Sequence, residues 1–186
     1  MRIISGRARG HRLKTLDGLD TRPTADRVKE SMFNMIACYV QDARILDLFA
    51  GTGNLGIEAL SRGACYAVFI DNSGMATKVI NDNLTHTKLI DKARVIKSDF
   101  NTYFAGIGAQ DKKFDIIFMD PPYSKDIILP TLKQIFKQNL LKQGGIIVIE
   151  SDKQDALPQV FQPYAIMRSK TYGRTVVTII SKDDDK

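Results

Sequence analysis

Hydrophobic residues recur with two different periods along this chain, and the alternation of those periods predicts an α/β domain. Short continuous apolar runs, typical of strands buried on both faces, cover residues 44–49, 65–70, 93–96, 114–119 and 146–150. Between the runs, apolar residues three and four positions apart predict helices over residues 23–39, from about residue 54, around residues 75–84 and over residues 127–140. Strands that alternate with helices predict a mostly parallel sheet covered by helices on both faces.

The end of the chain has a different pattern. Residues 165–171 and 176–180 read as two strands, and Tyr172-Gly173-Arg174 is short enough to join them as an antiparallel hairpin at one sheet edge. We also expect Gly144-Gly145 to end the preceding helix and residues 155–161 to form a short helical link. The expected organisation is a basic arm or hairpin over 1–22, one domain over 23–182, and a disordered tail over 183–186.

Composition narrows the class of protein. The chain has 186 residues, enough for one α/β domain but too few for two ordinary ones. Its two cysteines, Cys38 and Cys65, have no metal-binding spacing, so we expect each to be reduced and buried. Neither a signal peptide nor an apolar segment of membrane-spanning length is present, which predicts a cytoplasmic protein without membrane contact.

Positive charge is concentrated at the N-terminus. The net charge is +6, which favours a polyanionic partner. Five basic residues precede the first acid, with Gly6 and Gly10 among them: Arg2, Arg7, Arg9, Arg12 and Lys14. Such a cluster suits contact with nucleic-acid phosphates, although a solvated tail would have a similar composition.

The strand at 44–49 leads into a glycine loop. Gly51, Gly53 and Gly56 have the spacing G-x-G-x-x-G, and Asp71 lies 20 residues beyond Gly51, as in dinucleotide-binding sites. Asp47, however, lies at the mouth of the same loop, where a carboxylate would repel a pyrophosphate and attract a cation. S-adenosylmethionine (AdoMet) is a cationic ligand without phosphate. The alternative is an α/β turn whose glycines serve only packing.

Asp71, followed by Asn72, ends the second strand. An acid at this position can accept hydrogen bonds from both hydroxyls of a ribose, which predicts an adenosine site without choosing between NAD and AdoMet. Asp71 would also serve as the N-cap of the next helix.

The strand at 114–119 ends in Asp120-Pro121-Pro122-Tyr123. Two prolines fix the backbone and remove two N–H donors, so a carboxylate is followed by rigid carbonyl groups. Together they form a two-acceptor clamp for an exocyclic amino group, and Tyr123 can stack on the base that carries it. The alternative is a Pro-Pro stop after a buried strand. A base held in this way must first leave its stack.

At these two motifs the chain resembles class I AdoMet-dependent methyltransferases, and over nearly its full length it resembles the bacterial small-subunit rRNA guanine-N2 methyltransferases. The resemblance rests on the Arg2-Ile3-Ile4-Ser5-Gly6 start, Arg22-Pro23-Thr24, Asp47 to Gly53, Gly56 to Ala64, Asp120 to Tyr123 and Tyr172-Gly173. It implies a Rossmann-like sheet of seven strands with the last one antiparallel. It also implies AdoMet as methyl donor, S-adenosylhomocysteine (AdoHcy) as product, and no metal.

The resemblance further implies the substrate and a role for each site residue. The substrate would be the N2 amino group of a 16S rRNA guanine, of the type numbered 966, within a 30S subunit or an assembly intermediate, and the enzyme would be a monomer. The methionine end of the cofactor would lie at Asp47, Gly51 and Gly53, its ribose at Asp71 and Asn72, and its adenine at Asp99 and Phe100. Catalysis would use Asp120, Pro121, Pro122 and Tyr123. RNA would be held by Arg7, Arg9, Arg12, Lys14 and Arg22.

Other functions share parts of this pattern. An amino-methyltransferase for another rRNA or DNA base would use the same clamp, and so would one for protein glutamine, although glutamine enzymes usually carry Asn at the position of Asp120. A non-catalytic, AdoMet-binding ribosome-assembly factor is the alternative from another class. The NAD-oxidoreductase interpretation lacks a catalytic acid–base pair.

Overall fold

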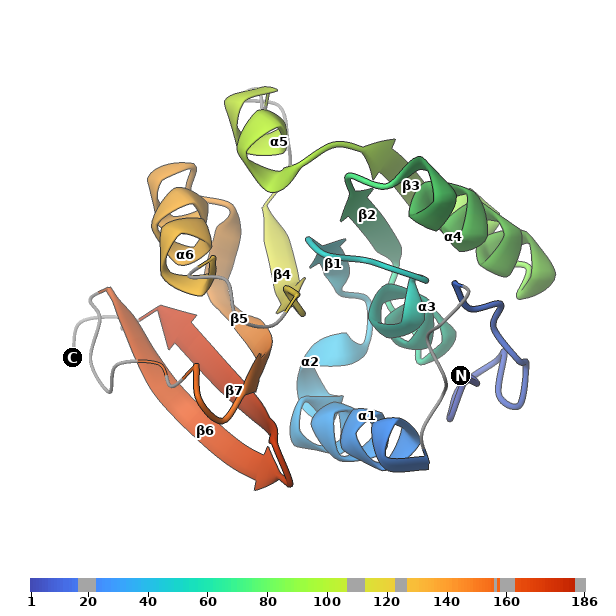
Figure 1. The fold of residues 1–186 in the computed structure, drawn as a ribbon, viewed down its shortest axis with the longest axis horizontal. Coiled ribbons are helices and arrows are strands. Elements are labelled where there is room, and N and C mark those ends of the chain that lie inside the picture. The colour runs from blue at the N-terminus through green and yellow to red at the C-terminus, as the bar shows by residue number, and fades with distance from the viewer. Residues whose placement is uncertain (17–22, 107–112, 123–126, 156, 158–162, 183–186) are drawn as a thin grey trace.

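The computed structural model describes residues 1–16, 23–106, 113–122, 127–155, 157 and 163–182. Within these residues the chain forms a seven-stranded sheet of order β3-β2-β1-β4-β5-β7-β6 (Figure 1). The strands are β1 Arg44–Asp47, β2 Tyr66–Asp71, β3 Ala93–Lys97, β4 Phe114–Met119, β5 Leu141–Asp152, β6 Tyr164–Tyr172 and β7 Thr175–Lys182. The helices are α1 Pro23–Met35, α2 Ala37–Val40, α3 Asn54–Ser61, α4 Gly74–His86, the 3-10 turn η1 Ile90–Lys92, α5 Phe100–Gly106 and α6 Ile128–Lys137.

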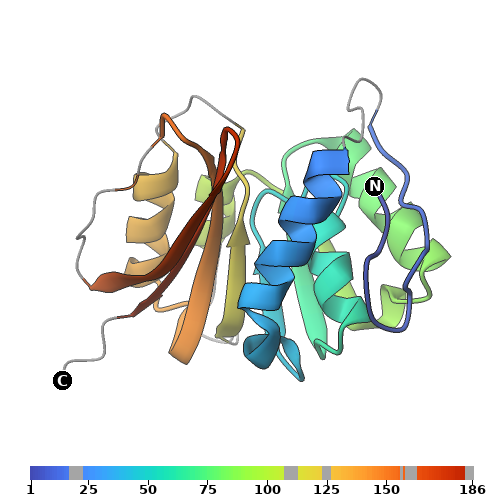
Figure 2. The ribbon, with the colours of Figure 1, turned by 90° about the horizontal axis from the view of Figure 1, so that it is seen from below.

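Helices cover both faces of the sheet, as predicted. Alternate residues of the central strands enter opposite cores: Ile45 and Phe118 face α1, α3 and α4, while Leu46 and Ile117 face α5 and α6. Side chains of successive strand residues point to opposite faces, so a strand covered on both sides must be apolar throughout. This explains why the central strands have continuous apolar runs rather than an alternating pattern. The two layers are visible on either side of the sheet in Figure 2.

The order of the strands reverses direction at the centre of the sheet. β1 lies between β2 and β4 and is parallel to both, so the chain moves outward to β3 and then returns to the other side of β1. In open α/β sheets ligands bind beyond the carboxyl ends of the strands at such a switch point. The loops after β1 and β4, which carry the two predicted motifs, lie at this point.

The C-terminal strands confirm the predicted hairpin. β7 is antiparallel to both β5 and β6, for example at Ile147↔Ile180 and Thr171↔Val176. Gly173 turns the chain at φ 63°, a left-handed conformation that favours glycine.

Among the described residues, we find no helix with the length and the apolar character that a membrane span requires.

The first residues fold back on themselves to form what we call the arm, residues 1–14. A single antiparallel bridge joins Arg2 to Arg12, and Ile3 N donates to His11 O (3.0 Å). Ile3 and Leu13 are buried against the main core, which fixes the arm to the domain. Figure 2 shows the arm running along the outside of α3 and α4.

Several predicted boundaries were wrong. The first helix was expected to continue to Tyr39, but it ends at Met35 and a separate short α2 follows. α6 ends at Lys137, not at Gly144-Gly145, because Asn139 takes the left-handed conformation (φ 51°) and Leu140 N donates to Ile135 O, as in a Schellman motif.

Two further expectations were wrong, and a third falls mostly on residues that the structure does not describe. Gly144 and Gly145 lie inside β5, which begins five residues earlier than predicted. Cys38 and Cys65 are exposed rather than buried, because Cys38 lies on the outer side of α2 and Cys65 precedes the buried part of β2. Most of the predicted link 155–161 and the predicted tail 183–186 lie outside the described residues.

Candidate active site

The glycine loop connects β1 to α3 and brings the backbone of residues 48–53 to the carboxyl end of the sheet. Gly51 (φ 55°) and Gly53 (φ 79°) both lie in the left-handed region, which explains why glycine occupies them. Gly56 has a different role, because a Cβ there would lie 2.3 Å from the ring of Phe69. The third glycine of the motif therefore permits α3 to pack on β2. Only Gly51 and Gly53 give the loop its shape.

Asp47 lies beneath this loop with its side chain buried. Its carboxylate accepts a hydrogen bond from Gly56 N (3.0 Å), which holds the first turn of α3 against the end of β1. Burial raises the pKa of Asp47 to about 7, and the negative charge of Asp71 contributes to the rise. A nearby cation would restore the ionised form, so Asp47 is suited to a positively charged ligand.

Asp71 ties the end of β2 to the glycine loop. One carboxylate oxygen accepts from Gly51 N (2.8 Å) and the other from Ser73 N (2.9 Å). The helix that follows is capped by Ser73, whose hydroxyl accepts from Ala76 N, so the alternative role of Asp71 as N-cap was wrong. Asn72 is exposed beside it.

Asp99 is exposed and caps α5. Its carboxylate accepts from Asn101 N, Thr102 N and the Thr102 hydroxyl, and these bonds, the Thr102 hydroxyl first, hold its pKa below the usual value. Phe100 is half-buried, with its ring centroid 5.7 Å from that of Phe49. Sequence reasoning missed Phe49, although an aromatic residue between Asp47 and the glycines was a usable signal. The two rings form an apolar wall beside the glycine loop.

Asp120 follows β4 and Glu150 lies at the same level on β5. The parallel register pairs Met119 with Ile149, so the next residues of the two strands, Asp120 and Glu150, are neighbours. Both side chains are half-buried. Burial raises the pKa of Asp120 well above its usual value, with further contributions from the charges of Glu150 and Asp47, and burial likewise raises the pKa of Glu150. No hydrogen bond from a described residue reaches either carboxylate.

Glu150 is a site residue that the sequence prediction missed. Its signal was an acid at the end of a continuous apolar strand, the pattern that identified Asp120, but only the register of β4 against β5 places the two acids together. Of the remaining clamp residues, Pro121 is buried and Pro122 exposed, while Tyr123 lies outside the described residues.

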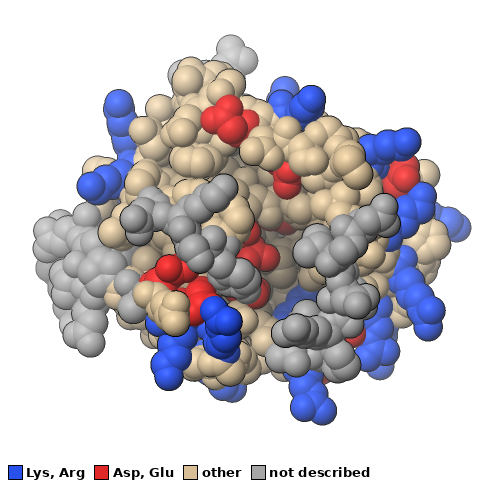
Figure 3. Space-filling view, in the orientation of Figure 1, with Lys and Arg blue, Asp and Glu red and all other residues tan. Residues whose placement is uncertain are grey.

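Figure 3 shows the face onto which these loops open. It is hollowed near its middle, over the region where Figure 1 places β1 and β4, and acidic side chains lie in the hollow. Lys and Arg side chains stand around the rim, many of them on the side of the arm and α4. An acidic interior with a basic rim can attract a polyanion to the surface and hold a cation within.

The predicted RNA-binding residues lie on the arm. Arg7, Arg9 and Arg12 are exposed and take part in no ion pair with a described residue. Lys14 is exposed but pairs with Asp82 on α4 (2.8 Å). Arg22 lies outside the described residues. A cavity of about 450 Å³ lies between the arm and α1, lined partly by the guanidinium side chains of Arg2, Arg9 and Arg27.

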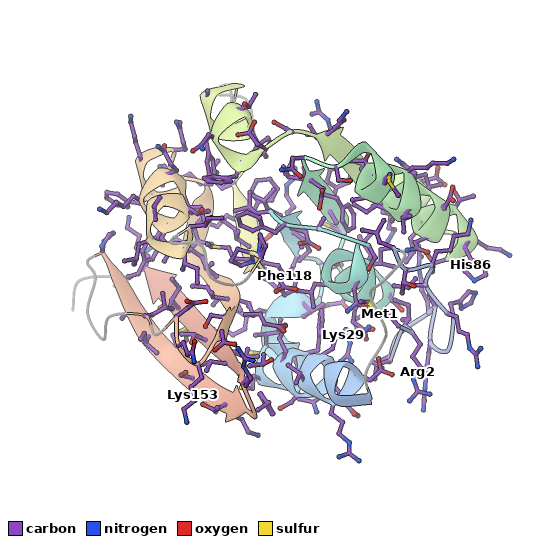
Figure 4. All side chains as sticks on the ribbon, in the orientation of Figure 1. Met1, Arg2, Lys29, His86, Phe118 and Lys153 are labelled. Atoms are coloured by element: carbon purple, nitrogen blue, oxygen red, sulfur yellow. The ribbon has the colours of Figure 1, made fainter. Side chains whose placement is uncertain are left out.

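A second buried charged cluster joins the arm to α1 and α3. Its centre is Glu58, which is fully buried and accepts from Ile4 N (2.8 Å) and Ser5 N (3.0 Å). Lys29 Nζ lies 3.2 Å and Arg62 Nε 2.6 Å from its carboxylate oxygens. Burial lowers the pKa of Lys29. Figure 4 shows Lys29 between α1 and α3, near Met1 and Arg2 of the arm.

Comparison with known proteins gives consistent matches over the whole chain. Residues 1–181 match the family described as "Conserved hypothetical protein 95". YlbH of Bacillus subtilis (strain 168), whose name assigns it provisionally to the rRNA methyltransferases, is 41% identical over 182 residues, covering 98% of this chain and 99% of its own. Ribosomal RNA small subunit methyltransferase D of Escherichia coli (strain K12) is 33% identical over 183 residues, covering 98% and 90%.

Solved structures show the same fold. The yhhF protein of Escherichia coli, titled provisionally as a methyltransferase, superposes with a TM-score of 0.88 at 34% identity and covers 100% of this chain and 99% of its own. The expected class I methyltransferase fold is thereby confirmed, including the antiparallel last strand.

Proposed function

The chain belongs to the conserved hypothetical protein 95 family, that of ribosomal RNA small subunit methyltransferase D, and we propose that it methylates the N2 amino group of a guanine in 16S rRNA. The methyl donor in this proposal is AdoMet, and the base is the guanine of the type numbered 966. Such a substrate would place the protein in the cytoplasm. In this proposal it acts as a monomer on a 30S subunit or an assembly intermediate.

The observation that carries the proposal is the pair of carboxylates at the switch point. Asp120 and Glu150 are half-buried, and the pKa of each is raised. No described residue donates a hydrogen bond to either carboxylate. Water can hydrate half-buried carboxylates in the free protein, so a ligand that displaces this water must supply donors in its place. An exocyclic amino group with its two N–H donors satisfies that need, and Asp120-Pro121-Pro122 offers it acceptors on a rigid backbone.

The surroundings also favour a cationic cofactor. When bound, AdoMet supplies an electrophilic methyl group attached to a positively charged sulfur. Asp47 is buried and Asp120 half-buried, and both carboxylates become easier to ionise beside a positive charge. Asp47 and the glycine loop would hold the methionine end. Asp71 would take the ribose hydroxyls with the oxygen lone pairs that its two backbone bonds leave free, with Asn72 beside it, and Phe49 and Phe100 would flank the adenine near Asp99.

Guanine is favoured over adenine by the second acceptor. The edge of guanine presents two adjacent donor groups, N1–H and N2–H₂, whereas adenine presents a donor N6–H₂ beside an acceptor N1. In our proposal Asp120 and the Pro121 carbonyl accept from N2–H₂ and Glu150 accepts from N1–H. Adenine would direct a lone pair at a carboxylate. Hydrogen bonds to the N2 hydrogens favour the pyramidal nitrogen that attacks the methyl carbon, and the N2 proton leaves afterwards.

The arm would dock the RNA backbone. Arg7, Arg9 and Arg12 are exposed cations on one small element, with Lys14 and Arg22 following them in sequence. Phosphate contacts fix the register of a protein on nucleic acid, while the base is read elsewhere. The target base would be splayed from its stack into the hollow, where Tyr123 would stack on it.

The test is methyl transfer from labelled AdoMet. Purified protein is incubated with 30S particles from cells that lack the enzyme, protein-free rRNA, DNA and a control protein. We expect label in the 16S rRNA with the wild type, none with Asp120→Ala, and normal label with Asp91→Ala, an exposed acid on η1. Label in DNA or protein would contradict the substrate. AdoMet binding without label in any substrate would contradict catalysis and favour an assembly factor.

A further inference from the structure

Three side-chain contacts fasten the arm to the glycine loop, and the proposed reaction does not require any of them. The contacts are made by Asn83 of α4, by Lys29 of α1, and by Thr52 of the loop itself. Each joins a backbone or side-chain atom of the arm to residues 52–54.

Asn83 makes the most complete contact. Its amide group donates to Thr52 O (2.9 Å) and to Lys14 O (3.1 Å), and its side-chain oxygen accepts from Lys14 N (2.8 Å). The side chain is fully buried, so water cannot replace these bonds. Thr52 lies between the two left-handed glycines, and the orientation of its carbonyl is therefore part of the shape of the loop.

Lys29 makes a parallel contact on the other side. Its ammonium group donates to Arg2 O (2.6 Å) and to the side-chain oxygen of Asn54 (2.7 Å), the first residue of α3. The Thr52 hydroxyl contacts Met1 Sδ at 3.6 Å. Both ends of the arm are thus attached to the loop, through Met1 and Arg2 at one end and Lys14 at the other. Figure 4 shows Lys29 between α1 and α3, with Met1 and Arg2 of the arm near it.

We propose that these contacts couple RNA binding on the arm to cofactor binding at the glycine loop, with Asn83 as the positioning residue that joins the two. The proposal rests on the proposed function, because it takes RNA as the ligand of the arm and AdoMet as the ligand of the loop. A ligand that orders the loop also fixes Thr52 O, and through Asn83 it fixes the backbone of Lys14. By linkage, RNA on the arm must then strengthen cofactor binding by the same factor.

The first experiment uses the unmodified full chain and no RNA. Hydrogen exchange is followed with and without saturating AdoHcy. We expect slower exchange in the loop and also at the arm amides that are hydrogen-bonded in this structure, Ile3, Leu13 and Lys14. Protection of the loop with unchanged exchange in the arm would overturn the coupling. If AdoHcy does not bind, the proposed function fails and the coupling fails with it.

The second experiment measures the coupling itself. The Kd of labelled AdoHcy is determined by equilibrium dialysis with and without saturating unmodified 30S particles. We expect binding to become about tenfold tighter with particles, within the usual range of coupling between sites. Equal affinities in the wild type, while methyl transfer is intact, would overturn the coupling and leave the proposed function standing.

A matched pair of variants identifies the residue. Asn83→Asp keeps the acceptor for Lys14 N but loses both donors, so the tenfold effect should fall below about twofold. Asn81→Asp adds the same charge to an exposed site on the same helix and should keep the full effect. A full effect in Asn83→Asp would remove Asn83 from the proposal. If Asn83→Asp does not fold, the two wild-type measurements decide.

Discussion

Two groups of acids in this protein have opposite surroundings. Glu58 is fully buried and has four donors: two backbone N–H groups of the arm, Lys29 and Arg62. Asp120 and Glu150 are half-buried, lie beside each other, and receive no hydrogen bond from a described residue. The first group is complete without a ligand. The second group has no donor among the described residues, so a ligand could supply one. Figure 3 shows that the face at this end of the sheet is hollowed and that acidic side chains lie in the hollow.

The difference distinguishes acids that stabilise the fold from acids that take part in the reaction. An ionised carboxylate with ideal partners contributes to the folded structure, and removing it leaves its partners uncompensated. A carboxylate without partners costs stability in the free protein and becomes useful only when a ligand is bound. The comparison therefore predicts that substitutions in the two groups affect different properties.

The largest expected effect is on catalysis at Asp120. Asp120→Ala should lower kcat/KM for methyl transfer at least about 1,000-fold, or about 4 kcal/mol in the transition state, because the amino group loses its anionic acceptor. The melting temperature should stay the same or rise, since the substitution removes a half-buried acid that no described residue stabilises. Single-turnover transfer and thermal unfolding measure the two properties. A large loss of stability would show that Asp120, like Glu58, stabilises the folded structure.

Glu58→Gln should have the reverse effect. Lys29 and Arg62 would lose their anion while remaining buried or nearly so, which typically costs about 3 kcal/mol of unfolding free energy. For a chain of this size the melting temperature should fall by roughly 10 °C. Methyl transfer by the folded fraction should fall far less than with Asp120→Ala. Denaturant unfolding gives the free energy, and unchanged stability would refute the architectural role of the cluster.

Because the pKa values of Asp47, Asp120 and Glu150 are raised in the folded protein, we expect an unusual response of stability to pH. Asp47, with a pKa near 7 when folded and 3.8 as its ordinary value, binds its proton more tightly in the folded state. The stability that Asp47 contributes is therefore present in full below about pH 4 and is lost as the pH rises through 7. The raised pKa values of Asp120 and Glu150 change stability in the same direction. The free protein should gain up to about 3 kcal/mol between pH 7 and pH 5.

The control for this pH response is Asp47→Asn, which should reduce it and leave the part that comes from Asp120 and Glu150. Asp82, Asp99 and Asp152 have lowered pKa values, so their opposing contributions change mainly below their ordinary value of 3.8. Unfolding curves at a series of pH values provide the measurement. Stability that rises with pH between 5 and 7 in the wild type would contradict the raised pKa of the buried Asp47.

The smallest predicted effect concerns the choice of base. Glu150→Gln should lower kcat/KM on the RNA about tenfold and raise the share of label in adenine, because the Gln amide can donate to adenine N1. Asp91→Asn, an exposed change of the same kind, should alter neither. Base composition of the labelled RNA gives the result. An unchanged rate and base preference would exclude Glu150 from recognition.

The acids at the end of the sheet also show what the sequence can predict. Asp47 and Asp120 were found because each follows an apolar run and precedes a loop of glycines or prolines, a pattern confined to neighbouring residues. The strands, the helices on both faces and the C-terminal hairpin followed from hydrophobic periods in the same way. Glu150 was missed because its importance depends on the register between β4 and β5, which α6 separates in the sequence.

The remaining errors have the same physical origin. Glu58 and Asn83 look like ordinary helix residues, and their partners in the arm are 53 and 69 positions away. The end of α6 was assigned to a glycine pair because glycine is the usual left-handed residue, yet Asn139 adopted that conformation first. Long-range contacts and competition among several possible helix ends are not encoded in a local pattern.

The most direct test of the central claim identifies the methylated atom. Unmodified 30S particles are incubated with the protein and labelled AdoMet, the 16S rRNA is digested to nucleosides, and the labelled nucleoside is identified by mass spectrometry. The proposed clamp predicts that the label appears as N2-methylguanosine at a single position. Label on adenosine, on a ring nitrogen of guanine, or on ribose would contradict a site in which Asp120 and Glu150 hold the amino edge of guanine.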